Sequence, residues 1–212
     1  MRIGVIQASS QSDKNAALYR CVRLAAEKNG REDTVVNYGV FPGEAETFSY
    51  IETALDICLL LSSGAADFIV TGCSSGQGMM LACNSLPGVL CGYVPTPQDA
   101  FLFGRINGGN AASFSLGLGY GWLGEINLQC TLDKLFEGPF GCGYPPGEAQ
   151  RKKRDAEALK AIGAITKRPL SEVVGVYDQE LVRKALRREA VREDILRHGT
   201  DREIAALIER YR

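Results

Sequence analysis

The 212-residue sequence contains a single histidine, His198, close to its end. This scarcity excludes histidine-rich metal sites and argues against a serine–histidine–aspartate triad. Seven cysteines are scattered along the chain, their number is odd, and none forms a CxxC pair. We therefore expect reduced, mostly buried thiols in place of a disulfide framework or a zinc site.

Long apolar runs and a strong net charge are also missing. No stretch approaches 18 consecutive apolar residues, and the beginning, MRIGVIQASS, lacks the apolar core and cleavage site of a signal peptide. We therefore expect a cytoplasmic protein that does not bind a membrane. The net charge of −1 gives the whole molecule no general attraction to nucleic acid.

The charge is divided unequally along the chain. Residues 1–147 contain 8 basic and 13 acidic side chains, and residues 148–212 contain 16 and 12. A segment rich in glycine, proline and aromatic residues, 136–150, lies at the change. This predicts an α/β domain over 1–147 and a helical C-terminal extension over 148–212. Basic residues recur at helical spacing in the extension, which favours packing on its own core or on a partner subunit over binding to DNA.

Apolar strands and amphipathic helices alternate through the first domain. Strands are expected at 3–7, 34–39, 67–72, 89–94 and 112–119, and helices at 14–29, 48–62, 76–85, 97–106 and 121–136. This alternation predicts a doubly wound (Rossmann-like), three-layer α/β/α fold with about five parallel strands. In the extension, helices are expected at about 148–165, 171–176, 178–196 and 200–211.

The stretch FIVTGCSSGQGMMLACNS, residues 68–85, predicts a strand that passes through a glycine-rich loop into a helix. The first N–H groups of a helix lack partners, and Gly76 and Gly78 allow another molecule to approach them. Such a loop can bind a phosphate or stabilise an oxyanion. Its positive field favours the thiolate form of a cysteine at its edge, which suits Cys73 to act as a base or a nucleophile. Ser74 and Ser75 add hydroxyl donors.

The same loop admits two other interpretations. The first is a plain tight turn that caps the following helix. The second is nucleotide binding, but the glycine spacing does not match GxGxxG and no lysine follows the last glycine as in a P-loop. The first loop, ASSQSDKN, also lacks the glycines that a dinucleotide pyrophosphate requires. Nucleotide binding is therefore disfavoured.

Four segments together resemble the type B ribose 5-phosphate isomerase and galactose 6-phosphate isomerase family. They read CSSGQG (73–78), LACNS (81–85), PGVL (87–90) and INGGN (106–110), and the spacing between them is that of the family. The resemblance covers about residues 1–160 and is specific for 67–119. It implies a cofactor-independent aldose–ketose isomerase of sugar phosphates, assembled as a homodimer or a dimer of dimers with sites between subunits.

The resemblance also implies roles for individual residues. Cys73 takes the position of the base that moves a proton between C1 and C2 of the open-chain sugar, and Ser75 takes the place of the family's threonine. The substrate-binding positions are Ser9, Ser74, Gly76, Gly78, Asn107 and Asn110. For the two arginines, four apart, that grip the phosphate in the family, this chain offers Arg151 and Arg154, of which Arg154 is in the better register; the planar guanidinium suits a phosphate. The alternative for this basic run is a solvated first turn of the helix.

The sequence departs from the family at its histidines. Ala8 and Ser9 stand where the family has Asp-His, Ile106 stands where it has the ring-opening histidine, and Ser49 occupies an expected acidic position. Ser9, Ser10 and Gln11 can still bind a polar ligand but are not acids at neutral pH. The departures leave a second hypothesis, a sugar- or sugar-phosphate-binding regulatory protein on the same fold without catalysis.

Overall fold

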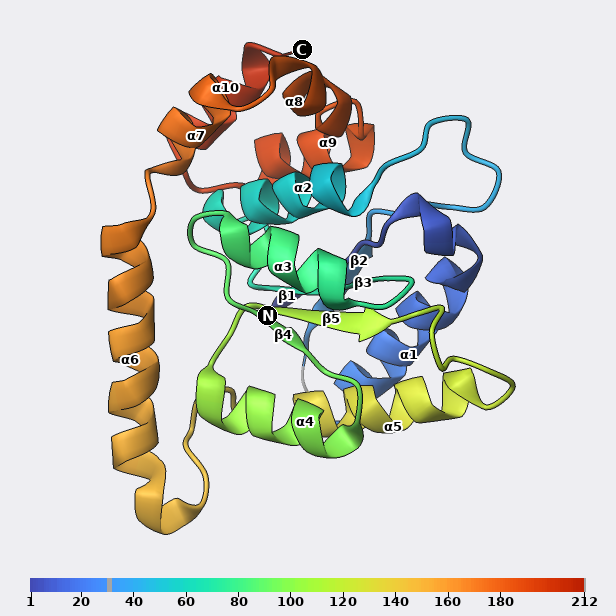
Figure 1. Cartoon of the computed structure of the whole chain (residues 1–212), viewed down its shortest axis with the longest axis vertical. Coiled ribbons are helices and arrows are strands. Elements are labelled where there is room, and N and C mark those ends of the chain that lie inside the picture. The colour runs from blue at the N-terminus through green and yellow to red at the C-terminus, as the bar shows by residue number, and fades with distance from the viewer. Residues whose placement is uncertain (30–31, 212) are drawn as a thin grey trace.

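The computed structural model describes residues 1–29 and 32–211. Its centre is a five-stranded parallel sheet in the order β2-β1-β3-β5-β4, which confirms the predicted fold class (Figure 1). The strands are β1 (Arg2–Val5), β2 (Thr34–Asn37), β3 (Phe68–Cys73), β4 (Cys91–Tyr93) and β5 (Ala111–Ser115). The central strand, β3, is buried along its whole length, as a strand covered on both faces should be.

Helices cover both faces of the sheet (Figure 1). One face packs on α1 (Asn15–Lys28), α4 (Pro97–Leu102) and α5 (Gly124–Phe136), and the other on α2 (Tyr50–Ser62) and α3 (Gln77–Ser85). A 3-10 turn, η1 (Ser9–Lys14), precedes α1, and a π turn, η2 (Phe103–Asn107), follows α4. Each face therefore has its own apolar core. Because all five strands are parallel, their carboxyl ends lie on the same side of the sheet.

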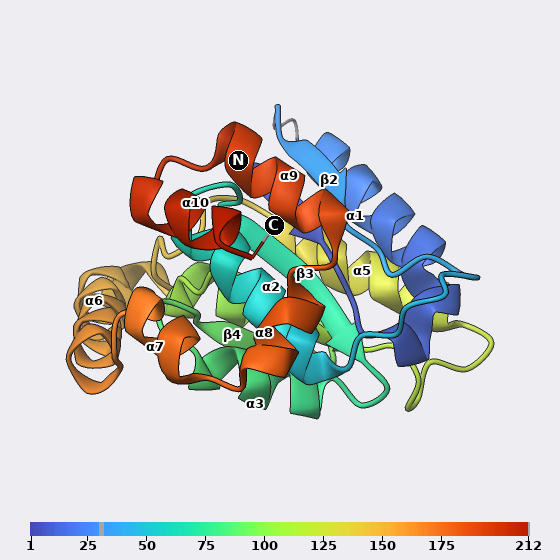
Figure 2. The ribbon, with the colours of Figure 1, turned by 90° about the horizontal axis from the view of Figure 1, so that it is seen from above.

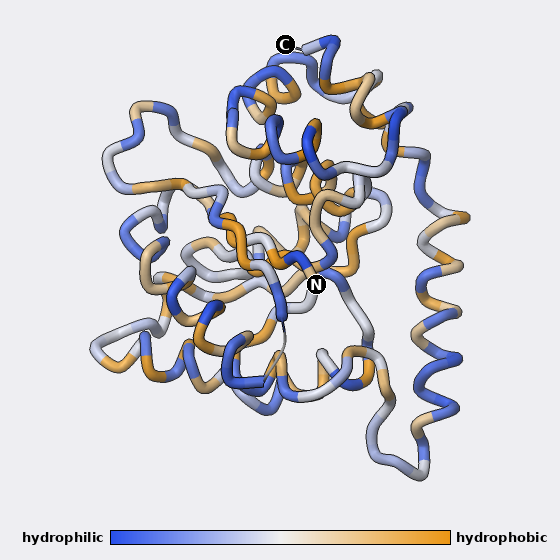
Figure 3. The backbone as a smooth tube through the Cα atoms, turned by 180° about the vertical axis from the view of Figure 1, so that it is seen from behind, coloured by the Kyte–Doolittle hydropathy of each residue, from blue (hydrophilic) through white to orange (hydrophobic). Residues whose placement is uncertain are grey.

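The C-terminal extension has two parts. The helix α6 (Ala149–Thr166), which follows a short 3-10 turn, η3 (Pro146–Glu148), has no buried residue. In Figure 3 hydrophilic and hydrophobic residues alternate along it, and it stands apart from the sheet. The helices α7 (Leu170–Val176), α8 (Gln179–Ala185), α9 (Glu189–His198) and α10 (Arg202–Glu209) follow it. Their apolar residues join the core cluster of α2 and α3.

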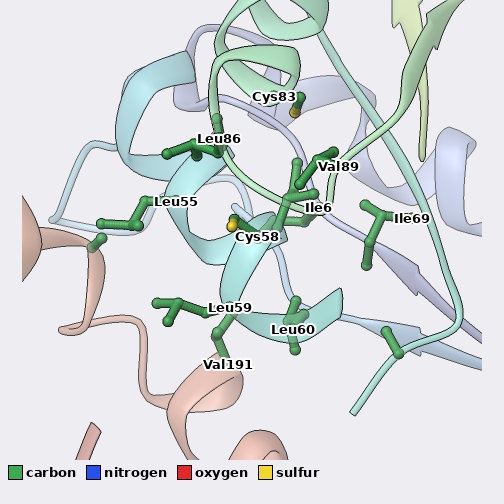
Figure 4. Packing of buried hydrophobic residues seen from close by; sticks show 14 of the residues in the cluster. Ile6, Leu55, Cys58, Leu59, Leu60, Ile69, Cys83, Leu86, Val89 and Val191 are labelled. Carbon is green, nitrogen blue, oxygen red and sulfur yellow. The ribbon is translucent and has the colours of Figure 1, made fainter. Parts of the chain in front are cut away.

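The packing of the extension on α2 is visible from two directions. From above, α8 and α9 lie over α2 (Figure 2). In close-up, Val191 of α9 lies beside Leu59, while Cys58 and Leu55 belong to the same α2 helix (Figure 4). The extension therefore packs on its own chain through these four helices. No helix within the described ranges is long and apolar enough to cross a membrane.

Three predicted elements differ most from the structure; the bounds of the others differ by no more than three residues at either end. The strand expected at 112–119 ends at Ser115, because the next residues turn back and donate hydrogen bonds to the carbonyls of Cys73 and Ser74. The helix expected at 97–106 ends at Leu102 and continues as the π turn. The helix expected at 178–196 breaks into α8 and α9 where Arg188, in an extended conformation, directs its side chain into the interior.

The start of α2 gives a stability prediction. Ser49 and Glu52 form a capping box, in which the Ser49 N–H donates to Glu52 Oε2 at 2.6 Å. We expect Ser49→Ala to lower the free energy of unfolding in urea by about 1 kcal/mol, since a capping hydroxyl is lost. Ser85→Ala is the matched control, because its hydroxyl only bonds back to the Leu81 carbonyl inside α3. Equal losses in both variants would contradict the capping role.

Candidate active site

The carboxyl end of β3 is the centre of the candidate site. Cys73 is the last residue of this central strand and pairs in register with Ser115 of β5. A three-residue loop follows, and α3 begins at Gln77. The order of strand, loop and helix is the one predicted from the sequence. It places a thiol beside the first turn of a helix at the ligand-binding edge of a doubly wound sheet.

Gly76 gives the loop its shape. Its φ of +74° lies in the left-handed region that favours glycine. A Cβ there would lie 2.8 Å from the Phe114 carbonyl carbon and 2.8 Å from a ring carbon of Tyr93. No other residue fits without moving the backbone of β5. The sharp turn presents the N–H groups of the first α3 turn, including that of Gly78, which have no intrahelical acceptor.

Cys73 and Cys91 are each 7% exposed, unlike the two fully enclosed thiols of the same core cluster, Cys58 and Cys83. Cys58 is fully enclosed, and burial raises the pKa of its thiol to about 12. A hydrogen bond with Cys91, together with burial, raises the pKa of Cys83. Among residues 1–29 and 32–211, no three His, Cys, Asp or Glu side chains gather in a way that would hold a metal ion.

The two loop serines have different surroundings. Ser75 Oγ accepts the N–H of Gln77 at 3.4 Å, at the start of α3. Ser74 is exposed, and its carbonyl accepts the N–H groups of Gly117 at 3.0 Å and Leu118 at 2.7 Å. The turn after β5 therefore holds the loop from the side. The hydroxyl of Ser74 faces the end of β1.

The end of β1 completes this edge of the site. The Ala8 N–H donates to the Gly72 carbonyl at 3.2 Å, which ties β1 to β3 just before the thiol. Gln11 Nε2 donates to Ser74 Oγ at 2.9 Å. Ser9 Oγ accepts the N–H of Phe48 at 2.6 Å, so this hydroxyl supports the protein's own backbone. Ser9, which the sequence predicted as a site residue, is thus two positions before Gln11, the residue that contacts Ser74.

Tyr50 and Ser115 belong to this edge but were not predicted from the sequence. The ring of Tyr50 lies 3.7 Å from the position of a Cβ on Gly78, so it flanks the first turn of α3. Ser115 Oγ donates to the Ser74 carbonyl at 3.1 Å. Neither residue lies in the glycine-rich segment. Only the pairing of β5 with β3, and the start of α2 opposite α3, bring them there.

Asn107 and Asn110 lie on the side of the sheet where the strands begin, whereas Cys73 lies at the carboxyl end of its strand. Asn110 comes just before β5, so about 16 Å of strand separates it from Ser115. Its side chain accepts the N–H of Leu90 at 2.8 Å and donates to the Gly88 carbonyl at 2.8 Å. Asn107 is exposed at the end of η2. Within one chain neither amide shares a site with the thiol.

A cavity of about 510 Å³ opens beside Asn110, between the loop before β4 and the second half of α6. Three cationic side chains and no carboxylate line it; the cations are Lys160, Lys167 and Arg168. Lys167 Nζ donates to the carbonyls of Asn84 at 2.6 Å and Leu86 at 2.8 Å, which ends α3. Burial lowers the pKa of Lys167.

Arg151 and Arg154 lie at the start of α6, the helix at the left of Figure 1, on the side of the sheet where β4 and β5 begin. Arg151 forms ion pairs with Glu148 at 2.6 Å and Asp155 at 3.0 Å on its own helix. Arg154 is exposed. The structure therefore groups the predicted site residues in two sets. One surrounds Cys73 at the carboxyl ends of the strands, and the other lies near the start of β5 and on α6.

Comparison with known proteins gives the chain its relatives. The model of a family described as Ribose/Galactose Isomerase matches residues 5–138. No curated protein matches the chain. A solved structure of a 4-deoxy-L-threo-5-hexosulose-uronate ketol-isomerase, complexed with a tartrate, is 38% identical with a TM-score of 0.94; the match covers 100% of this chain and 99% of that one. A ribose-5-phosphate isomerase from Vibrio parahaemolyticus is 36% identical, also with a TM-score of 0.94, over 100% of this chain and 99% of that one.

Shorter proteins share the fold alone. The type B ribose 5-phosphate isomerase of Trypanosoma brucei is 22% identical with a TM-score of 0.60, and the match covers 76% of this chain and 97% of that one. The family model covers more than half of the chain, and the two longer structures match its whole length. The resemblance seen in the sequence is thereby confirmed: the chain belongs to the ribose/galactose isomerase family.

Proposed function

We propose that this protein is a cofactor-independent aldose–ketose isomerase of an anionic sugar and that Cys73 is its base. The observation that supports this most is the position of the thiol. It ends the central strand, beside a glycine in the left-handed conformation that opens the first turn of α3. A base next to a set of outward N–H groups is what an enediolate mechanism requires.

The reaction moves one proton along two carbons. The Cys73 thiolate removes the proton from C2 of the open-chain aldose, the electron pair of the broken C2–H bond forms the C1–C2 double bond of an enediolate, and the π pair of the C1 carbonyl moves to O1. N–H groups of the loop, from Ser74 to Gly78, stabilise the oxygen that gains negative charge. The thiol then returns the proton to C1, and the proton of the C2 hydroxyl passes to O1. The C1–C2 double bond is lost and C2 becomes the carbonyl carbon, which gives the ketose. Ser75, in the place of the family's threonine, is proposed to donate to a substrate oxygen.

The second set of predicted residues requires a second copy of the chain. Because Asn107 and Arg154 lie far from Cys73 in one chain, we infer a homodimer, or a dimer of dimers, in which the partner copy brings them to the thiol. Residues 148–212 are proposed as a separate extension that serves this assembly. The exposed apolar side chains of α6 support this: Leu159, Ile162 and Ile165 are 46%, 57% and 83% exposed. The side chain of Asn110 already serves its own loop, so Asn107 is the more available amide.

The anionic group of the substrate is proposed to be a phosphate or a carboxylate. The two full-length relatives are named for different substrates, a hexosulose uronate and ribose 5-phosphate. No arginine or lysine belongs to the contacts described around Cys73, so the cations for either anion come from elsewhere in the assembly. Arg151 and Arg154 are the proposed candidates, because a guanidinium pairs with both groups.

A second candidate is a sugar-binding regulatory protein without catalysis. It is favoured by Ser9 and Ile106, which stand at the family's histidine positions and leave no imidazole there; Ile106 occupies the position assigned to ring opening. It is opposed by the thiol and glycine loop, which binding alone does not require.

A panel of sugars separates the two candidates. Ribose 5-phosphate, galactose 6-phosphate and a 4-deoxy-5-keto-hexuronate are incubated with the protein in deuterated water. Binding is followed by calorimetry, and isomerisation and deuterium incorporation by NMR. We expect at least one sugar to be isomerised, with deuterium entering at C1 or C2. If at least one sugar binds and none is isomerised or exchanged, the regulatory candidate is supported. If no sugar binds and none is exchanged, both candidates are rejected.

A further inference from the structure

The C-terminal extension contacts α2 and the segment that leads into it through three basic residues. Lys184 Nζ lies 3.0 Å from Glu52 Oε1, and Arg187 Nη1 lies 3.1 Å from Glu46 Oε1. Arg188 is the buried member of this set, 6% exposed. We call the three residues the basic clamp. It lies outside the matched family region, which ends at residue 138.

Arg188 makes contacts in two directions. Its guanidinium lies 3.1 Å from the Asp56 carboxylate and donates to Thr53 Oγ1 at 3.3 Å, both on α2. It also lies over the ring of Phe48, 4.2 Å from the centroid, in a cation–π contact. Because the guanidinium is held on α2, it fixes the position of the Phe48 ring, which is itself buried.

Phe48 connects this contact to the candidate site. Its N–H and carbonyl both bond to Ser9, the N–H donating to Ser9 Oγ at 2.6 Å and the carbonyl accepting the Ser9 N–H at 2.9 Å. Ser9 begins the short turn that also holds Gln11, whose amide donates to Ser74 Oγ at 2.9 Å. Ser74 is the neighbour of Cys73 in the chain. An unbroken series of contacts therefore runs from the extension to the loop beside the thiol.

A second series of contacts reaches the same loop from the other side. Lys184 holds Glu52, and Glu52 accepts the N–H of Ser49 at 2.6 Å in the capping box of α2. The next residue, Tyr50, places its ring against Gly78 in the first turn of α3. The two series have no residue in common. The first ends at Ser74 and the second at Gly78, so they contact the glycine-rich segment at its two ends.

We propose that Arg188 is a positioning residue for the isomerase site: through Phe48 and Ser9 it holds the loop from Ser74 to Gly78 in the geometry that Cys73 requires. This inference rests on the proposed function only in that the site around Cys73 is taken to catalyse isomerisation. The mechanical part, that Arg188 and Phe48 control the surroundings of Cys73, stands apart from any substrate. It assigns to the extension a role beyond assembly.

The test measures Cys73 itself. Full-length wild type, Phe48→Leu and Arg188→Lys are treated with iodoacetamide under native conditions, and alkylation of each cysteine is followed by peptide mass spectrometry. Leucine removes the ring but keeps an apolar side chain, and lysine keeps a positive charge near Asp56. In both variants we expect Cys73 to be alkylated about tenfold faster, since the loop beside it loses its support. Cys58 and Cys83, fully enclosed in the same core, report any global unfolding.

Ile208→Val is the matched control, because it removes one buried methyl group from the extension without touching the clamp. The Cys73 alkylation rate of Ile208→Val should equal that of wild type, even if its melting temperature falls as much as that of Phe48→Leu or Arg188→Lys. If an isomerised sugar is found, kcat of Phe48→Leu should fall about tenfold with KM within about twofold, since a misplaced loop acts on the transition state.

Three results would overturn the proposal. The first is an unchanged Cys73 alkylation rate in both Phe48→Leu and Arg188→Lys. The second is an increase shared equally by Cys58 and Cys83, and the third is the same increase in Ile208→Val. A wild type without isomerase activity would reject the proposed function while the alkylation rates still decide whether Arg188 positions the loop.

Discussion

Replacement of Cys73 by alanine is expected to lower the isomerisation rate by about a thousandfold, the contribution of a positioned general base. Binding should change little, because the thiol gives the bound sugar no charge–charge contact. The fold should persist, since the residue lies at the rim of its core cluster and its side chain is small. The measurement is deuterium incorporation and turnover on the sugar identified by the panel, together with the melting temperature.

Two further variants sharpen this result. Cys73→Ser keeps the shape of the side chain but replaces the thiol by a hydroxyl, which is a far poorer base at neutral pH. It should lose as much activity as the alanine variant. Cys83→Ala removes a neighbouring buried thiol and should keep kcat while it lowers stability. Retained proton exchange in Cys73→Ala would show that another group is the base.

Replacement of Arg188 by methionine is expected to lower the free energy of unfolding by about 3–5 kcal/mol at pH 8, because it leaves the Asp56 carboxylate buried without a cation. The two groups lie 3.1 Å apart, but the contact is not aligned as a hydrogen bond. Both are almost fully enclosed, so the loss of hydration is the main cost of burying each charge. Urea unfolding at a fixed pH measures the loss.

The loss should depend on pH in a defined direction. Burial raises the pKa of Asp56 to about 7, a rise that Arg188 opposes and Glu52 reinforces. The folded state therefore keeps a proton on Asp56 over a range in which the unfolded carboxyl, with an ordinary value of 3.8, has released it. Stability from this group is complete at low pH and is lost as pH rises through about 7. Arg188→Met should thus be more costly at pH 8 than at pH 5.

Two controls accompany this prediction. Arg187→Met breaks only an exposed pair with Glu46 and should change stability by about 0.5 kcal/mol or less. The double variant Asp56→Leu with Arg188→Met replaces both charges by apolar side chains and should recover most of the loss. A loss in Arg188→Met that is the same at pH 5 and pH 8 would show that Asp56 is not the group left unpaired.

The fold was predictable because its signals are local. Each buried strand is a short apolar run, each helix repeats apolar residues at helical spacing, and the loop from Ser74 to Gly76 marks the change between them. The residues around the thiol were predictable for the same reason, since they follow one another in the chain. The residues near the start of β5 and on α6, by contrast, were assigned through the resemblance alone.

The features that were missed depend on distant partners. Nothing in the run from residue 178 to 196 marks a helix break, because the break serves the contact of Arg188 with Asp56, 132 positions earlier. The apolar residues after Ser115 read as strand, yet the N–H groups of Gly117 and Leu118 both bond to the carbonyl of Ser74, in the loop after β3. The amide of Asn110 looks free in the sequence and is committed to Leu90 and Gly88 in the fold.

The first strand and a late helix are also joined directly. Asp194 of α9 accepts hydrogen bonds from Arg2 and from the hydroxyl of Tyr38, the latter at 2.6 Å. The ribosome synthesises Asp194 only 192 residues after Arg2 and 156 residues after Tyr38. A growing chain therefore keeps the outer side of its earliest strands uncovered until α9 has left the exit tunnel, and chaperones that shield exposed apolar surface have that whole interval in which to act.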